Sequence, residues 1–143
     1  MILSYPAKIK YLNEDKSYMV EFPDLPGCLT EGKSLGDAKS NAKEALTGYL
    51  ASIFEREHKI PDPSNIKGRN VYFIEPEPEV SVPILLKKLR VKKHLTQSDI
   101  AKVLGISYQA YQRLEKPGKS NPTLKTLERL AKVFKKDLRL EFA

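Results

Sequence analysis

The sequence predicts an α+β protein built from two small domains, and its periodicity and charge carry that prediction. Residues 1–75 combine short stretches of alternating polarity with one long helical stretch, whereas helical periodicity dominates residues 82–143. Residues 1–80 contain 10 Lys and Arg against 13 Asp and Glu, and residues 81–143 contain 15 against 5. A net charge of −3 beside one of +10 indicates two domains with different partners, and a polyanion suits the basic one.

The first domain is expected to fold in the order β-β-β-α-β, as a small sheet with one helix against a face. The strands are expected at residues 6–12, 17–22, 28–32 and 70–75. Turn residues 13–16 separate the first two strands and predict a β-hairpin. Ser34 is placed to cap a helix over about 35–57, whose apolar residues recur at three- and four-residue steps and form one stripe.

A proline-rich stretch, "EPEPEVSVP" at residues 75–83, marks the domain boundary. Alternating Glu and Pro favour an extended, solvated linker, because Pro neither continues a helix nor donates to a central strand. The predicted organisation is a first domain at 1–75, a linker at 76–81 and a second domain at 82–143.

The second domain is expected to contain four helices, followed by a strand. The helices are expected at residues 82–93, 97–104, 108–115 and 124–134. Thr96 and Asp99 form a short capping box, and Gly105 stands where a left-handed C-cap is wanted. Ser107 and Thr123 cap the last two helices. The tail "LRLEF" at 138–142 alternates with period two and predicts a C-terminal strand.

The second and third of these helices are predicted to form a helix-turn-helix. Ala101 is small where the helices must approach, and Gly105 can adopt positive φ in the turn. The residues expected inside are Ile106, Tyr111 and Leu114, which leaves Tyr108, Gln109, Gln112 and Arg113 on the outer side.

The outer side is suited to reading DNA. Gln and Arg pair bidentately with adenine and guanine edges in the major groove. Gln97, at a helix N-terminus, is placed to bond a phosphate, and Ser107 joins the candidate DNA-binding residues at the start of the reading helix. Lys119, with Lys116 and Lys125 nearby, lies where phosphates would pass. Each residue alone would suit a solvated helix face, so the prediction depends on their coincidence with a charge of +10.

The segment "LTQSDIAKVLGISYQAYQRLEKPGKSNPTLKTLERLAKVF" resembles the Cro/C1-type (Xre-like) helix-turn-helix family of phage-type repressors. The resemblance covers about residues 82–134. It implies base contacts by the four outer residues and phosphate contacts by Gln97 and Lys119. Pro117 departs from the family pattern and predicts that the third helix stops by Lys116.

The first domain resembles the HicB antitoxin family. The resemblance depends on "YMVEFPDLPGCLTEG" and the Ala- and Leu-rich helix that follows it, with "PDLPGC" as the most specific part. It implies a partial ribonuclease-H-like fold, a HicA-type ribonuclease toxin as partner and repression of the chain's own operon. An acidic domain is physically suited to mask a basic RNA-binding toxin.

The first domain carries no convincing catalytic constellation. Glu21, Asp24 and Glu31 lie near one another in sequence, but strand alternation does not make them converge on a metal. They are kept as candidate toxin-binding residues. His58 and His94 are too far apart in sequence to suggest a metal pair, and Cys28 has no recognisable base. The chain is therefore predicted to have no catalytic residue, metal or cofactor, and not to be an enzyme.

Two other functions stay open at this stage. The first is a ligand-sensing repressor without a toxin partner, and the second is a metal-dependent nuclease. In each case a cytoplasmic location is expected, because there is one cysteine, no apolar run of roughly 20 residues and no signal peptide. A homodimer or higher homo-oligomer is expected, since operator binding needs two reading helices, and the tail strand is the candidate contact.

Overall fold

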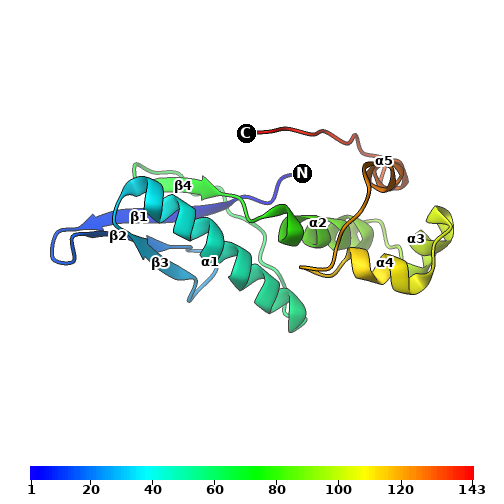
Figure 1. Ribbon diagram of the computed structural model, residues 1–143, viewed down its shortest axis with the longest axis horizontal. Coiled ribbons are helices and arrows are strands. Elements are labelled where there is room, and N and C mark those ends of the chain that lie inside the picture. Colours follow the sequence, from blue (N-terminus) through cyan, green and yellow to red (C-terminus); the bar gives the residue numbers. More distant parts are fainter. The chain divides into compact units, whose positions relative to one another are not determined.

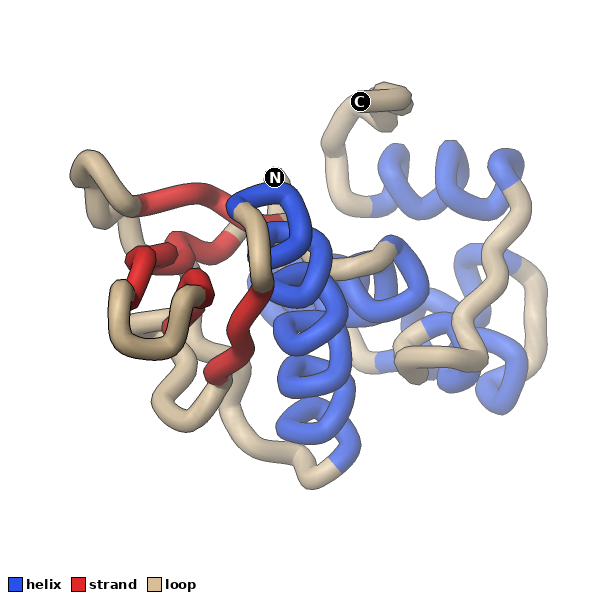
Figure 2. The backbone as a smooth tube through the Cα atoms, turned by 60° about the vertical axis from the view of Figure 1, so that its left-hand side comes forward, coloured by secondary structure: helices blue, strands red, loops and turns tan.

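The computed structural model describes residues 1–143, which divide into two compact units, Met1–Ser81 and Val82–Ala143. Figures 1 and 2 show strands confined to the first unit and short helices in the second. The mixed α+β fold class is therefore confirmed. None of the five helices is both long and apolar enough to cross a bilayer.

The first unit is a four-stranded antiparallel sheet with one helix, in the predicted order. The elements are β1 (Tyr5–Leu12), β2 (Ser17–Glu21), β3 (Leu29–Gly32), α1 (Leu35–Glu55) and β4 (Val71–Ile74). The strands lie in the order β3-β2-β1-β4, so β3 and β4 are the edges. Ser34 caps α1 as predicted, since its hydroxyl accepts from the Asp37 N–H at 3.0 Å.

The core of this unit lies between the sheet and α1. Alternation along β1 buries Tyr5, Ala7 and Ile9 and leaves Lys8 and Lys10 on the opposite face. From α1 the core receives one stripe of fully buried residues, namely Ala38, Ala42, Leu46 and Leu50. Burying each leucine stabilises the fold by about 1.5–3 kcal/mol.

Two hydrogen bonds hold the irregular segment between α1 and β4, one to strand β1 and one to the loop between β2 and β3. The Tyr5 hydroxyl donates to the Pro61 carbonyl at 2.6 Å, and the Ser64 N–H donates to Asp24 Oδ2 at 2.8 Å.

Cys28 is buried, and this burial raises the pKa of its thiol to about 11. The thiol is therefore protonated and packs as a small apolar group.

The expectation of an extended linker at 75–83 is wrong. Helix α2 (Pro78–Lys92) begins inside this stretch, and residue 77 is tied to α1. The Glu77 N–H donates to Thr47 Oγ1 at 3.0 Å, and the Glu77 carboxylate lies 3.6 Å from Lys43 Nζ. Pro78 is tolerated because the first helical position needs no N–H donor, whereas Pro83 removes one bond inside the helix.

The second unit is helical. After α2 come α3 (Gln97–Leu104), α4 (Tyr108–Leu114) and α5 (Leu124–Val133), all close to the predicted bounds. Its core comprises Leu86, Ile100, Ala101, Leu104, Tyr111, Leu114, Leu130 and Phe134. Helical periodicity predicts that Val91 of α2 and Leu124 of α5 face the core, but they are 55% and 57% exposed.

The tail departs from expectation. Residues 136–143 form no strand, and the side chains of Leu140 and Phe142 are 73% and 93% exposed. A strand needs a neighbour to receive its backbone hydrogen bonds, and the helical second unit offers none. The tail also leaves these two apolar side chains uncovered by its own helices.

Candidate nucleic-acid interface

Helix α3 begins at a complete capping box. The Thr96 hydroxyl accepts from the Asp99 N–H at 3.0 Å, and the Asp99 carboxylate accepts from the Thr96 N–H at 2.8 Å. This second bond holds the pKa of the exposed Asp99 carboxyl below its usual value. The helix start is thereby fixed by two side chains three positions apart, as the sequence predicts.

The turn that follows has the predicted left-handed residue. Gly105 has a φ of 69° and ends α3, and Ile106 N–H returns to the Ala101 carbonyl at 3.0 Å. Only glycine takes this backbone conformation without steric cost. Ser107 then starts α4, since its hydroxyl accepts from the Ala110 N–H at 3.0 Å.

Helix α4 has a buried side and an exposed side. Tyr111 is fully buried and Leu114 is 9% exposed. The residues on the other side are Tyr108, Gln109, Gln112 and Arg113. Tyr108, Gln109 and Arg113 are exposed, while Gln112 is half-buried with its amide 3.5 Å from the Tyr108 hydroxyl. The four side chains predicted to face outward therefore do so together.

A buried carboxylate joins helices α2, α3 and α4. Glu115, at the C-cap of α4, is only 3% exposed. Its oxygens accept from Arg90 Nε at 2.7 Å and Arg90 Nη2 at 3.0 Å, and from Gln97 Nε2 at 3.2 Å. Arg90 also donates to the Leu95 carbonyl, and its bonds to Glu115 raise the pKa of the guanidinium. One carboxylate thus joins α2, the start of α3 and the end of α4.

Helix α5 supports the same assembly. Arg129 Nη2 donates to the Leu104 carbonyl at 2.7 Å, at the end of α3. The last carbonyls of a helix lack partners within it, so this bond satisfies one of them and places a positive charge at the negative helix end.

The candidate phosphate-binding residues are placed differently from one another. Lys119 is exposed in the loop after α4, together with Lys116, so both can reach an external anion. Gln97 is half-buried, and one of its amide hydrogens is used by Glu115. Only the remaining amide hydrogen and the nearby backbone N–H groups are available to a phosphate.

The candidate toxin-binding acids do not form a cluster. Glu21 is exposed on β2 in register with Lys8, and Glu31 is exposed on β3 in register with Met19. Asp24 is half-buried and accepts the Ser64 N–H, which gives it a structural role. No three His, Cys, Asp or Glu side chains of the chain are grouped so that they could hold a metal ion.

Comparison with known protein families assigns both units. The family described as "HicB_like antitoxin of bacterial toxin-antitoxin system" matches residues 5–92, and "Helix-turn-helix" matches residues 86–140. The chain belongs to the HicB-like antitoxin family. Both resemblances inferred from the sequence are confirmed, and the match to the antitoxin family extends into α2.

Two curated relatives of this HicB-like chain are antitoxins of the same family. Antitoxin HicB of Escherichia coli (strain K12) is 32% identical over 112 residues, which are 78% of this chain and 80% of the relative. Antitoxin HicB 2 of Photorhabdus laumondii is 30% identical over 112 residues, 78% of this chain and 77% of that one. A chain of a toxin-antitoxin complex from Streptococcus pneumoniae aligns with a TM-score of 0.47 at 18% identity, over 71% of this chain and 95% of that chain.

Sequence reasoning missed the supporting residues of the HicB-like chain's helix-turn-helix. In the sequence Arg90 and Arg129 are two of many basic residues, and no local pattern links either of them to Glu115. One signal was available, because Glu115 follows Tyr111 by one helical turn and so falls on the buried side of α4. An acid at a buried position requires a charged partner.

Replacing Glu115 by Ala should destabilise the second unit by about 3–5 kcal/mol, because it leaves the Arg90 guanidinium buried without its partner. Urea unfolding followed by circular dichroism at 222 nm measures the change. Glu128→Ala, at an exposed position of α5, is the control and should change stability by less than about 0.5 kcal/mol. Equal stability of the two variants would show that the ion pair does not hold the helices together.

Proposed function

We propose that this HicB-like chain is the antitoxin of a type II toxin-antitoxin system. Its first unit neutralises a HicA-type mRNA-cleaving toxin, and its second unit represses the operon by sequence-specific DNA binding. The chain acts by binding and not by catalysis. The observation that carries the DNA-binding half is α4, because burial of Tyr111 and Leu114 turns four polar side chains outward together.

The charge of each unit supports this division of labour. The basic second unit suits DNA, whose phosphates supply most of the non-specific affinity. The acidic first unit suits a protein that must itself be basic in order to bind RNA. A ligand-sensing repressor would also bind DNA through the second unit. Binding of a toxin by the first unit therefore distinguishes an antitoxin from such a repressor.

The toxin-binding half is tested by identifying a short basic reading frame beside this chain's gene and co-purifying its product with this chain. The pair should form a stable complex, and the neighbouring protein alone should cleave RNA. Adding this chain at equimolar concentration should abolish the cleavage, measured by release of a fluorophore from a labelled RNA.

A chain that leaves the cleavage unchanged, or a neighbour that neither binds nor cleaves, would exclude the antitoxin function and leave the ligand-sensing repressor. Cleavage of RNA by this chain alone, abolished by EDTA, would instead support a metal-dependent nuclease.

Base reading and phosphate binding are separated by two substitutions on the surface of the second unit. Gln109→Ala should lower the discrimination between operator and random duplex by roughly 1–3 kcal/mol, because a base contact is lost. Lys119→Ala should weaken binding to both duplexes about equally and flatten the salt dependence, because a phosphate contact carries no sequence information.

Fluorescence anisotropy at several salt concentrations measures both effects. Lys132→Ala, at an exposed position of α5 outside the candidate set, serves as the matched charge control. Equal losses on the two duplexes for Gln109→Ala would remove Gln109 from the base-reading set.

The tail is proposed to hold two copies together for operator binding. Leu138, Leu140 and Phe142 are exposed, and a symmetry mate would give residues 138–142 the strand neighbour that their own unit lacks. Such a contact would fix two reading helices about 34 Å apart, one turn of DNA.

Deleting residues 137–143 should therefore make the second unit monomeric and lower operator affinity, while binding of the toxin is unchanged. Sedimentation velocity and anisotropy measure the two effects. The control is the double variant Arg139→Ser, Glu141→Ser. It changes only the polar residues between Leu138, Leu140 and Phe142, and it should stay dimeric. A truncated chain that dimerises and binds operator normally would refute the proposed contact.

A further inference from the structure

Strand β3 has a free edge whose backbone polarity can be assigned. The Phe22 N–H donates to the Cys28 carbonyl at 3.3 Å, which sets the phase of the β2–β3 ladder. In an antiparallel pair every second residue then turns its N–H and C=O away from the partner strand. These residues are Leu29 and Glu31, so their backbone groups point to the outer edge of the sheet.

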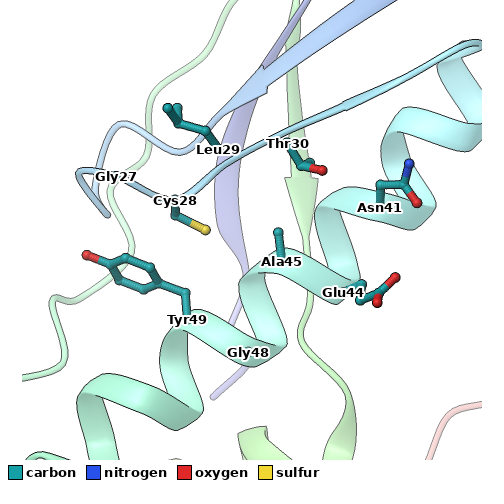
Figure 3. A pocket seen from close by; sticks show the side chains of 9 residues that line it. All are labelled: Gly27, Cys28, Leu29, Thr30, Asn41, Glu44, Ala45, Gly48 and Tyr49. Carbon is teal, nitrogen blue, oxygen red and sulfur yellow. The ribbon is translucent and has the colours of Figure 1, made fainter.

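A groove runs along this edge, between β3 and α1. Its volume is about 540 Å³, and its walls are residues 27–30 on one side and the α1 face around Ala45 on the other. Figure 3 shows Cys28 and Thr30 across from Asn41 and Ala45, with Tyr49 at one end and the Leu29 side chain turned away from α1. Gly48 keeps the α1 wall low, and a Cβ built there would have no atom within 4 Å.

One side chain occupies the edge. Asn41 Nδ2 donates to the Glu31 carbonyl at 2.8 Å. The N–H groups of Leu29 and Glu31 and the carbonyl of Leu29 are left for an incoming strand, and a strand that paired fully would replace the Asn41 amide. The Leu29 side chain, 58% exposed, lies on the face of the sheet opposite α1, so Leu29 contributes its backbone groups to this edge.

The charges of α1 are divided between its two flanks. Lys39 Nζ lies 4.3 Å from the centre of the Tyr72 ring, and Lys43 Nζ lies 3.6 Å from Glu77, so both lysines turn toward β4 and the residues after it. The flank toward β3 carries Glu44, and no lysine or arginine lines the groove. The groove therefore favours a cationic occupant.

We propose that this groove binds an extended, basic segment of the toxin, which adds a strand to β3. The assignment rests on the proposed antitoxin function. Addition of a strand to a sheet edge takes affinity from the main-chain hydrogen bonds and specificity from the side chains that flank them. Here Glu44 selects for Lys or Arg, and the low wall at Gly48 and Ala45 admits the strand itself.

The uncovered face of the same sheet is less suitable for such a partner. The pocket on that face, opposite α1, is lined by three lysines and one acid, namely Lys8, Lys10, Lys67 and Glu21. A basic ribonuclease would meet like charge there.

The test compares paired variants of the full chain for affinity to the short basic protein encoded beside it, measured by isothermal titration calorimetry. Gly48→Met fills the groove and Gly48→Ala does not, while both replace a helical glycine by a good helix former. Gly48→Met should raise Kd about 10-fold or more, the loss expected if one or more strand hydrogen bonds cannot form. Gly48→Ala should leave Kd within about 3-fold.

Two further pairs test the edge and the charge. Leu29→Pro removes an outward N–H without touching the β2–β3 ladder, and Leu29→Ala keeps that N–H. Glu44→Lys reverses the charge in the groove, and Glu14→Lys makes the same change in the exposed hairpin turn. In each pair the first variant should bind the neighbouring protein more weakly than the second. Circular dichroism establishes that each variant is folded, and the Gly48 pair decides the test if Leu29→Pro does not fold.

The outcomes separate the groove from the function. Wild-type chain that fails to bind the neighbouring protein overturns the antitoxin function and this assignment with it. Wild-type binding that all three groove variants retain overturns the groove alone. A Gly48→Met chain whose mass falls in sedimentation without any toxin present would show that the groove holds a second copy, and would also overturn the proposal.

Discussion

The buried carboxylate of Glu115 is the constraint on which the second unit depends. A carboxylate removed from water is costly unless every strong acceptor site is used. Arg90 supplies two donors and Gln97 supplies a third, so α2, α3 and α4 must keep one relative arrangement for the charge to be satisfied. The exposed side of α4 is therefore held by a polar contact as well as by the apolar core around Tyr111.

Charged side chains also distinguish the two flanks of helix α1 in the first unit. Helix α1 uses its apolar stripe against the sheet and divides its charged residues between the two flanks. The flank toward β4 is occupied by contacts within the chain. The flank toward β3 is left with an acid, an open strand edge and little side-chain bulk. Helix α1 thus uses its flank toward β4 for contacts within the chain and leaves its flank toward the β3 edge available to a partner.

Local signals were read from the sequence with the most success. Ser34, Thr96, Ser107 and Thr123 each cap the helix predicted for them, because capping depends only on residues within one turn. Three-dimensional packing was harder to predict. Leu86, and not Val91, enters the core of the second unit, since the tertiary neighbours select which side of α2 is buried. The linker prediction failed because the contacts of Glu77 with Lys43 and Thr47 join residues 30 or more positions apart.

Those contacts of Glu77 determine how the protein can be dissected. A proteolytic fragment or truncation that ends at residue 75 removes the partner of Lys43 and the donor to Thr47, and with them part of the first unit. A cut after Ser81 keeps both contacts but divides α2 after its fourth residue. Linkers added to tag or fuse the first unit therefore belong beyond Ser81, where the new chain end can fray without loosening α1.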